Sequence, residues 1–236
     1  MPNGDIVVKN PFYEISFTGS HINIDFVKMG KKAKFYYTNS IRAGTMRIHL
    51  LKNKNTAKEI ESSPDGKKAT LIFSDECKSE SYDIESEIKF TFSNDNPIIK
   101  YEASLKQKEP FKRYSIALNK FWFGEETTKE MPFYAGGNPY CENKISDRRG
   151  GLAPGNWKNK YRYFCMNDKE NALGIISGTE QNSYIYADEK QKGGNLSGCD
   201  VESWNTETFA MSQYIYAGPL GEKAEHMAKW AEKLYK

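Results

Sequence analysis

Apolar and polar residues alternate along most of the first half of the chain, with the period of two that is typical of half-buried β-strands. The clearest case is residues 82–92, YDIESEIKFTF. One side of this run carries Tyr82, Ile84, Ile88, Phe90 and Phe92, and the other carries Asp83, Glu85, Glu87, Lys89 and Thr91. The pattern predicts a strand with one buried face and one wet face. Ser86 is the polar exception on the apolar side; it indicates a nearby bend or, as the alternative, room left for a ligand.

Similar runs recur along the chain and are separated by turn residues such as SPDGKK at 63–68 and SNDNP at 93–97. They fall at residues 5–9, 12–17, 21–28, 68–74, 98–107, 113–124, 161–166, 172–177, 183–188 and 207–218. A dozen or more short strands exceed the seven of an immunoglobulin domain. We therefore expect an all-β protein, a large two-sheet antiparallel β-sandwich, with no internal repeat.

The end of the chain has a different period. Leu220, Ala224, Met227, Ala228, Ala231, Leu234 and Tyr235 stand at helical spacing. Pro219 near the start, and Glu222 and Glu225 in the early turns, suit a helix N-terminus. We expect a β-sandwich domain over residues 1–218 and a C-terminal amphipathic α-helix over 219–236. The helix either packs on the sandwich or leads to a helical domain beyond this sequence.

Composition narrows the class of protein. Apolar residues make up 38% of the 236 and aromatic residues 14%, which favours a folded chain. The 34 basic and 31 acidic residues are interspersed and leave a net charge of +3, too small for a nucleic-acid footprint. No signal peptide or apolar run of about 20 residues is visible, so we expect a soluble protein, either cytoplasmic or secreted with its signal removed.

The four cysteines, Cys77, Cys141, Cys165 and Cys199, show no C-x-x-C spacing and do not predict a zinc site. Two disulfides and buried thiols both remain open. No P-loop, G-x-G-x-x-G, G-x-S-x-G or H-E-x-x-H motif occurs, so we expect neither a cofactor nor a metal, and no nucleotide-binding or hydrolase-triad site.

Residues 134–164 interrupt the strand pattern with five glycines, two prolines and both signs of charge. We call them the 134–164 segment. Long loops without secondary structure are uncommon in compact domains and are usually functional or disordered. Because the segment also contains aromatic residues, we interpret it as an ordered binding loop and not as a slack linker.

The order of these features resembles the galactose mutarotase-like β-supersandwich, a domain of many glycoside hydrolases and polysaccharide lyases. The resemblance rests on residues 10–36, NPFYEISFTGSHINIDFVKMGKKAKFY, and on the strand pair at 89–111, KFTFSNDNPIIKYEASLKQKEPF. It covers about residues 6–218 and includes no diagnostic catalytic motif. It implies a carbohydrate-binding or carbohydrate-processing domain.

The histidines depart from this resemblance. Mutarotases of the fold use histidines and a carboxylate to open and close the sugar ring, whereas this chain has only His21, His49 and His226. His21 belongs to an early strand and His226 to the terminal helix, so we do not carry over the epimerase activity. An epimerase with an altered acid/base pair would need His49 to face a carboxylate in a cleft.

Saccharide binding requires flat rings that stack on pyranose C–H faces and polar groups that match the hydroxyls. The 134–164 segment supplies both kinds. Its candidate platforms are Tyr134, Tyr140 and Trp157, and its candidate hydrogen-bonding groups are Asn138, Glu142, Asp147, Arg148 and Arg149. The competing interpretation is that the aromatic residues fill the core beneath a loop. Arg148 and Arg149 either receive an anionic sugar group or form a solvated salt bridge with Asp147.

Whether the protein is an enzyme stays open at this stage. Glu142, Asp147, Glu180, Glu202 and Glu207 supply many carboxylate pairs for a glycoside hydrolase, and Tyr140 with Arg148 fits a polysaccharide lyase. The rival hypothesis is a structural domain, in which the terminal helix docks a helical catalytic domain and the 134–164 segment shapes that interface.

Overall fold

The computed structural model describes the chain in sixteen stretches. These are residues 6–18, 21–25, 32–36, 40–43, 46–49, 57–79, 82–111, 114–117, 120–123, 132–137, 141–144, 161–167, 170–177, 196–197, 200–203 and 206–234. The predicted strand at 183–188 lies outside them.

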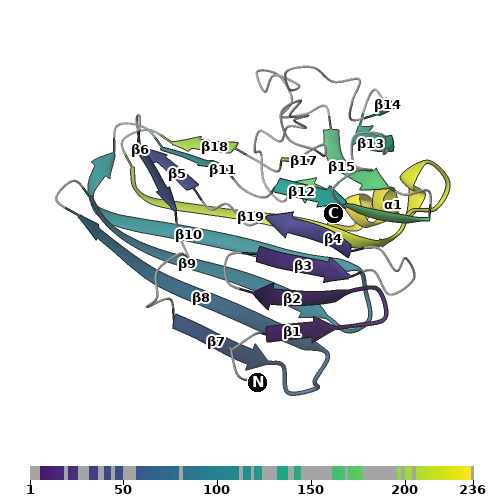
Figure 1. Cartoon of the computed structure of the whole chain (residues 1–236), viewed down its shortest axis with the longest axis horizontal. Helices are drawn as coiled ribbons and strands as arrows, with labels where there is room; N and C mark the ends of the chain where they lie inside the picture. Colours follow the sequence, from purple (N-terminus) through teal and green to yellow (C-terminus); the bar gives the residue numbers. More distant parts are fainter. Residues whose placement is uncertain are drawn as a thin grey trace.

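The largest element is a nine-stranded sheet that forms one layer of the molecule (Figure 1). In spatial order it contains β14 (Cys141–Lys144), β13 (Pro132–Gly137), β15 (Tyr161–Asn167), β16 (Asn171–Ser177), β19 (Thr206–Pro219), β10 (Ile98–Phe111), β9 (Tyr82–Ser93), β8 (Lys68–Ser79) and β7 (Ala57–Ser62). Strands β8, β9, β10 and β19 are long, and β19 joins the two halves of the sheet because it pairs with both β10 and β16.

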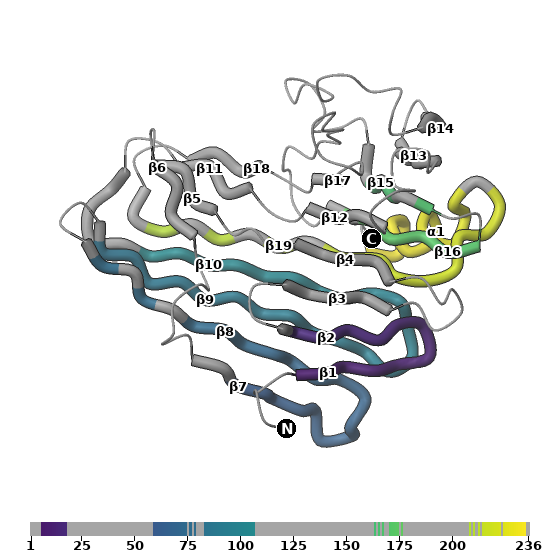
Figure 2. The backbone as a smooth tube through the Cα atoms, in the orientation of Figure 1, coloured from purple at the N-terminus to yellow at the C-terminus, as the bar shows by residue number. Residues whose placement is uncertain are grey.

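Two smaller sheets complete the fold. The six-stranded sheet contains β1 (Ile6–Lys9), β2 (Glu14–Thr18), β3 (His21–Asp25), β4 (Lys32–Tyr36), β12 (Lys120–Phe123) and β17 (Leu196–Ser197). The four-stranded sheet contains β18 (Asp200–Ser203), β11 (Tyr114–Ala117), β5 (Ser40–Ala43) and β6 (Met46–His49). Strands β1 and β2 cross in front of β8 and β9 (Figure 2). Every described strand pair is antiparallel, so the predicted all-β antiparallel sandwich is confirmed.

The first core lies between β2 and the long strands. Phe17 contacts Phe73, Phe90 and Phe92, with ring centroids 5.4–6.0 Å apart. The alternation predicted for residues 82–92 is confirmed at every described position: Ile84, Ile88, Phe90 and Phe92 are buried, whereas their neighbours are partly or fully exposed. Ser86 is buried on the same face, opposite Leu105 of β10.

One side chain ties the two layers together near the β1–β2 turn. The Asn10 amide oxygen accepts hydrogen bonds from the backbone N–H groups of Phe12 and Tyr13, at 2.8 and 2.9 Å. Its amide nitrogen donates to the carbonyl oxygens of Ser93 and Asn96, at 2.9 and 3.2 Å. Asn10 therefore fixes the first hairpin against the turn between β9 and β10.

The C-terminal helix α1 (Glu225–Leu234) follows a single 3₁₀ turn, η4 (Glu222–Ala224). It begins later than Pro219 suggested, because Pro219 is the last residue of β19. Its apolar stripe covers the end of the nine-stranded sheet, on the face that points away from the six-stranded sheet. We call this second core the helix cluster: Ile98, Tyr163, Cys165, Ala172, Ile176, Tyr216, Leu220, Ala224, Met227 and Ala231. Cys165 is a buried thiol, which excludes the option of two disulfides using all four cysteines.

The prediction of an irregular 134–164 segment is wrong at its N-terminal end, whereas the strand predicted at 161–166 is confirmed by β15. Residues 134–137 belong to β13, residues 141–144 form β14, and β15 begins at Tyr161. Glycine and proline hide the alternation here, and pairing to β15 produces the strand; the register shifts between Gly136 and Gly137, where glycine suits a bulge. Residues 145–160 lie outside the described residues.

Candidate functional site

Two of the predicted site residues are brought together by the β13–β14 hairpin. Tyr134 of β13 stands directly opposite Glu142 of β14 in the strand register. Directly opposed Cα positions on antiparallel strands lie about 4.5–5.5 Å apart, which is within reach of one sugar ring. The structure thus places one candidate aromatic platform and one candidate carboxylate at the same point on the edge of the sheet.

The other six predicted site residues lie outside the described residues: Asn138, Tyr140, Asp147, Arg148, Arg149 and Trp157. Their role in a saccharide site stays a prediction. The strand positions of Glu202 in β18 and Glu207 in β19 are described, and these two residues belong to different sheets.

The row that contains Tyr134 leads across the sheet to the helix cluster. Tyr134 is opposite Cys165, Cys165 is opposite Gly174, and Gly174 is opposite Tyr216. Cys165 and Tyr216 are both buried beneath α1. The hairpin is therefore connected, through β15 and β16, to the residues that are buried beneath α1.

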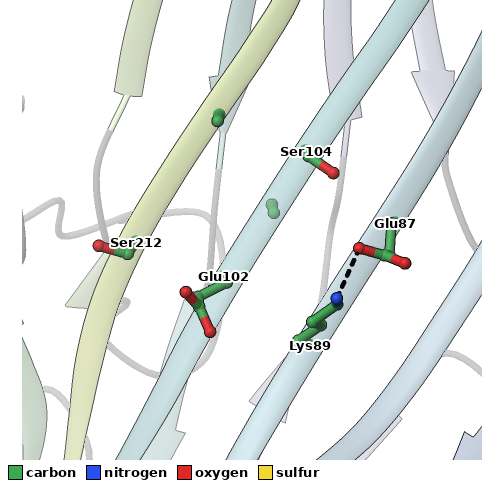
Figure 3. A pocket seen from close by; sticks show the side chains of 7 residues that line it. Glu87, Lys89, Glu102, Ser104 and Ser212 are labelled. Carbon is green, nitrogen blue, oxygen red and sulfur yellow. Dashed lines mark ion pairs between the residues drawn. The ribbon is translucent and has the colours of Figure 1, made fainter.

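A hollow opens on the same face of the sheet, beyond the end of the helix cluster. We call it the sheet groove. It has a volume of about 370 Å³ and is lined by Glu87 and Lys89 of β9, Glu102, Ala103 and Ser104 of β10, and Ala210 and Ser212 of β19. Figure 3 shows the five polar side chains on one side of the three strands. The hollow forms because short serine and alanine side chains stand between longer charged ones.

The charged groups of the sheet groove are arranged in pairs. The Lys89 ammonium lies 2.9 Å from a Glu87 carboxylate oxygen, and Lys100, one position beyond the groove along β10, lies 2.7 Å from a Glu102 oxygen. The hydrogen bond to Glu87 raises the pKa of Lys89, and the negative charges of Glu87, Glu61 and Glu102 add to this effect. Lys89 therefore stays protonated, which makes it a hydrogen-bond donor and not a general base.

Two partly buried aromatic residues pack against the helix cluster, and one of them, Tyr214, follows the sheet groove along β19. Tyr214 is two residues from Ser212 on the same face of β19, and it packs against the helix cluster together with Trp230 of α1. The Lys233 ammonium lies 4.3 Å from the centre of the Trp230 ring, a cation–π contact.

Glu87, Lys89 and Glu102 were not predicted as site residues, because in the sequence they look like ordinary outward-facing strand positions. The available signal was the strand register, which puts Lys89 and Ser212 on either side of Glu102. Among the described residues, no group of three or more His, Cys, Asp or Glu is placed to hold a metal ion. Within the same part of the chain, no helix combines the length and apolar character needed to cross a membrane.

Comparison with known proteins shows a fold and no sequence family. No protein-family profile matches the chain, and no curated protein matches it. Solved structures do. An α-N-acetylgalactosaminidase, NagBb from Bifidobacterium bifidum, superimposes with a TM-score of 0.68 at 9% identity, over 97% of this chain and 39% of its own.

Two further solved structures extend the comparison. The GH36 α-galactosidase AgaA from Geobacillus stearothermophilus has a TM-score of 0.58 at 8% identity, over 92% of this chain and 41% of its own. A galactose mutarotase-related enzyme from Lactobacillus acidophilus has a TM-score of 0.52 at 10% identity, and 97% of its chain is covered by 90% of this one. The protein therefore has the galactose mutarotase-like sandwich fold, and it spans well under half of the two glycosidase chains.

Proposed function

We propose that this protein is a carbohydrate-binding or carbohydrate-processing domain, with a saccharide site walled by the 134–164 segment. The observation that supports it most is the likeness of nearly the whole chain to a glycosidase domain and to a mutarotase-related enzyme. Because such low identities establish the fold alone, the function must be carried by the site.

The hairpin geometry supports this location of the site. Tyr134 and Glu142 are opposed at the sheet edge, next to the part of the segment that contains Tyr140, Arg148 and Trp157. A ring that stacks on the C–H face of a sugar, with a carboxylate accepting from its hydroxyls, is the arrangement that saccharide recognition needs.

The test is a glycan-array screen of the purified chain, repeated with Trp157→Ala and Arg148→Ala. We expect binding to one class of glycan and loss of signal with both variants. Arg148→Lys is the matched control for charge: it keeps the cation but loses the bidentate geometry, so it separates anion recognition from general attraction. Absence of binding by folded protein on every glycan contradicts the proposal.

Turnover is a separate question, to be put to the glycan that binds. Hydrolysis, lyase cleavage with its unsaturated product, and anomer exchange have distinct readouts. We expect Glu142→Gln to abolish turnover while leaving binding if Glu142 acts as one of two catalytic carboxylates.

The covered lengths support a second candidate function. Because this chain matches only 39% and 41% of the two glycosidases, its fold also occurs as one part of larger enzymes. A structural domain of this kind would dock a helical catalytic domain instead of holding ligand. Tight, glycan-independent association with such a domain, unaffected by Trp157→Ala, would favour this candidate.

A further inference from the structure

The sheet groove is built from two neighbouring register rows. Lys89, Glu102 and Ser212 form one row across β9, β10 and β19, and Glu87, Ser104 and Ala210 form the next. Neighbouring strands lie about 4.8 Å apart, and side chains on one face repeat about every 7 Å along a strand. The groove therefore presents hydrogen-bonding groups on a grid several ångströms across in each direction.

Its charges cancel locally. Glu87 neutralises Lys89, and Lys100 neutralises Glu102, each at less than 3 Å. An anionic ligand that approaches either lysine would compete with a carboxylate that is already in contact. The groove consequently favours a neutral ligand over a uronate, sulfate or phosphate.

In the described part of the chain, the ion pairs of the sheet groove use only part of its hydrogen-bonding capacity. Each ammonium has three donors and each carboxylate about four acceptor positions, of which the pair at Lys89 uses one each. Ser104 and Ser212 add hydroxyl groups that both donate and accept. A ligand with many closely spaced hydroxyl groups matches this mixture of donors and acceptors.

The volume of the groove fits the same class of ligand. About 370 Å³ lies within the usual range of small-molecule sites. Tyr214, two residues beyond Ser212 on the same face of β19, is not part of the groove lining and packs against the helix cluster.

From these observations we propose that the sheet groove is a second glycan site, specific for a neutral oligosaccharide. The choice of a carbohydrate rests on the proposed function above, but the groove and the 134–164 segment share no residue. The groove binds the glycan through Glu87, Lys89, Glu102, Ser104 and Ser212.

Two variants test the groove without removing a core residue. Ser212→Trp fills the hollow. Glu102→Gln keeps the shape of the groove but removes the charge that neutralises Lys100. Glu222→Gln is the matched control, because Glu222 is an exposed glutamate in η4, outside the sheet that carries the groove. Urea unfolding of each variant establishes that it is folded.

The measurement is titration calorimetry with neutral oligosaccharides and, in parallel, with uronate-containing ones of equal length. We expect Ser212→Trp to weaken binding of the neutral glycan about tenfold or more, and Glu222→Gln to leave it unchanged. Glu102→Gln should reduce the preference for neutral over uronate glycans, because it frees Lys100. In amide NMR spectra, shifts on glycan addition should include Ser104 and Ser212.

The outcomes separate the two proposals. If Ser212→Trp binds glycan normally and Trp157→Ala loses glycan binding, the proposal of a glycan site in the sheet groove is overturned and the proposed function stands. Loss in Ser212→Trp with normal binding by Trp157→Ala supports the groove and removes the 134–164 segment from the site. Absence of glycan binding by the folded wild-type chain overturns both.

Discussion

At the scale of single residues, Asn10 carries more structural connections than its surface position suggests. Asn10→Ala removes all four of its hydrogen bonds and leaves the N–H groups of Phe12 and Tyr13 without their acceptor. We expect a loss of about 1–3 kcal/mol in the free energy of unfolding, measured by urea denaturation. Asn94→Ala, at an exposed position in the β9–β10 turn, is the control and should change it little.

Two buried tyrosine hydroxyls differ in their hydrogen bonding. The Tyr13 hydroxyl is buried and has no hydrogen-bond partner in the described part of the chain, whereas the Tyr216 hydroxyl donates to the carbonyl oxygen of Pro219 at 2.5 Å. Tyr13→Phe should therefore leave stability unchanged or raise it, and Tyr216→Phe should lower it by about 1 kcal/mol. Thermal unfolding of both variants checks this; equal losses would contradict it.

Burial of Tyr163 links stability to alkaline pH. Desolvation, with smaller effects of the charges of Cys165 and Glu232, raises the pKa of Tyr163 from 10.0 to about 12. Between pH 10 and 12 the unfolded state releases the Tyr163 proton while the folded state still keeps it. The contribution of Tyr163 to the free energy of unfolding is therefore complete below pH 10 and is lost between pH 10 and 12. Burial raises the pKa of Tyr13 and Tyr216 in the same direction.

We therefore expect the free energy of unfolding to fall above pH 10, and the fall to be shallower in Tyr163→Phe by about 1.4 kcal/mol per pH unit. Urea unfolding at intervals from pH 9 to 12 measures the slope. An unchanged slope in the variant would show that Tyr163 ionises as easily in the folded protein as in the unfolded one.

At the scale of elements, one face of α1 packs against the rest of the protein. Met227 is fully buried in the helix cluster, whereas Lys229 is exposed and forms a 3.7 Å ion pair with Glu225. Met227→Ala should cost about 2–5 kcal/mol and Lys229→Ala about 0.5 kcal/mol or less. Calorimetric melting of the two variants tests the difference. That α1 also leads into a further domain stays a prediction.

Periodicity identified the elements that bury one regular face. The alternation over residues 82–92 and the helical spacing of Met227 and Ala231 both correspond to buried stripes in the structure. It missed β13 and β14, because the glycines and asparagines there carry no apolar period and are held in strands by their neighbours. It also missed the sheet groove, because the groove depends on which residues face each other across β9, β10 and β19.

At the scale of the whole molecule, the two cores share strands. Ile98 and Tyr216 face the helix cluster, whereas their neighbours Ile99 and Ile215 are buried on the opposite face of the same two strands. Unfolding of either core removes strands that the other requires. We expect Phe90→Ala and Met227→Ala, one in each core, to shift the unfolding midpoints of tryptophan fluorescence and far-UV circular dichroism together. Separate midpoints for the two probes would show that the cores unfold independently.

The central place of β19 has a consequence for synthesis. The ribosome completes β10 at Phe111 long before it reaches Thr206, and the interval takes roughly 5–20 seconds at usual elongation rates. Throughout that time one edge of β10 lacks the strand that will cover it, so the nascent chain offers an open backbone edge to other chains. We expect this window, and not the finished protein, to be the stage at which aggregation competes and chaperones have most effect.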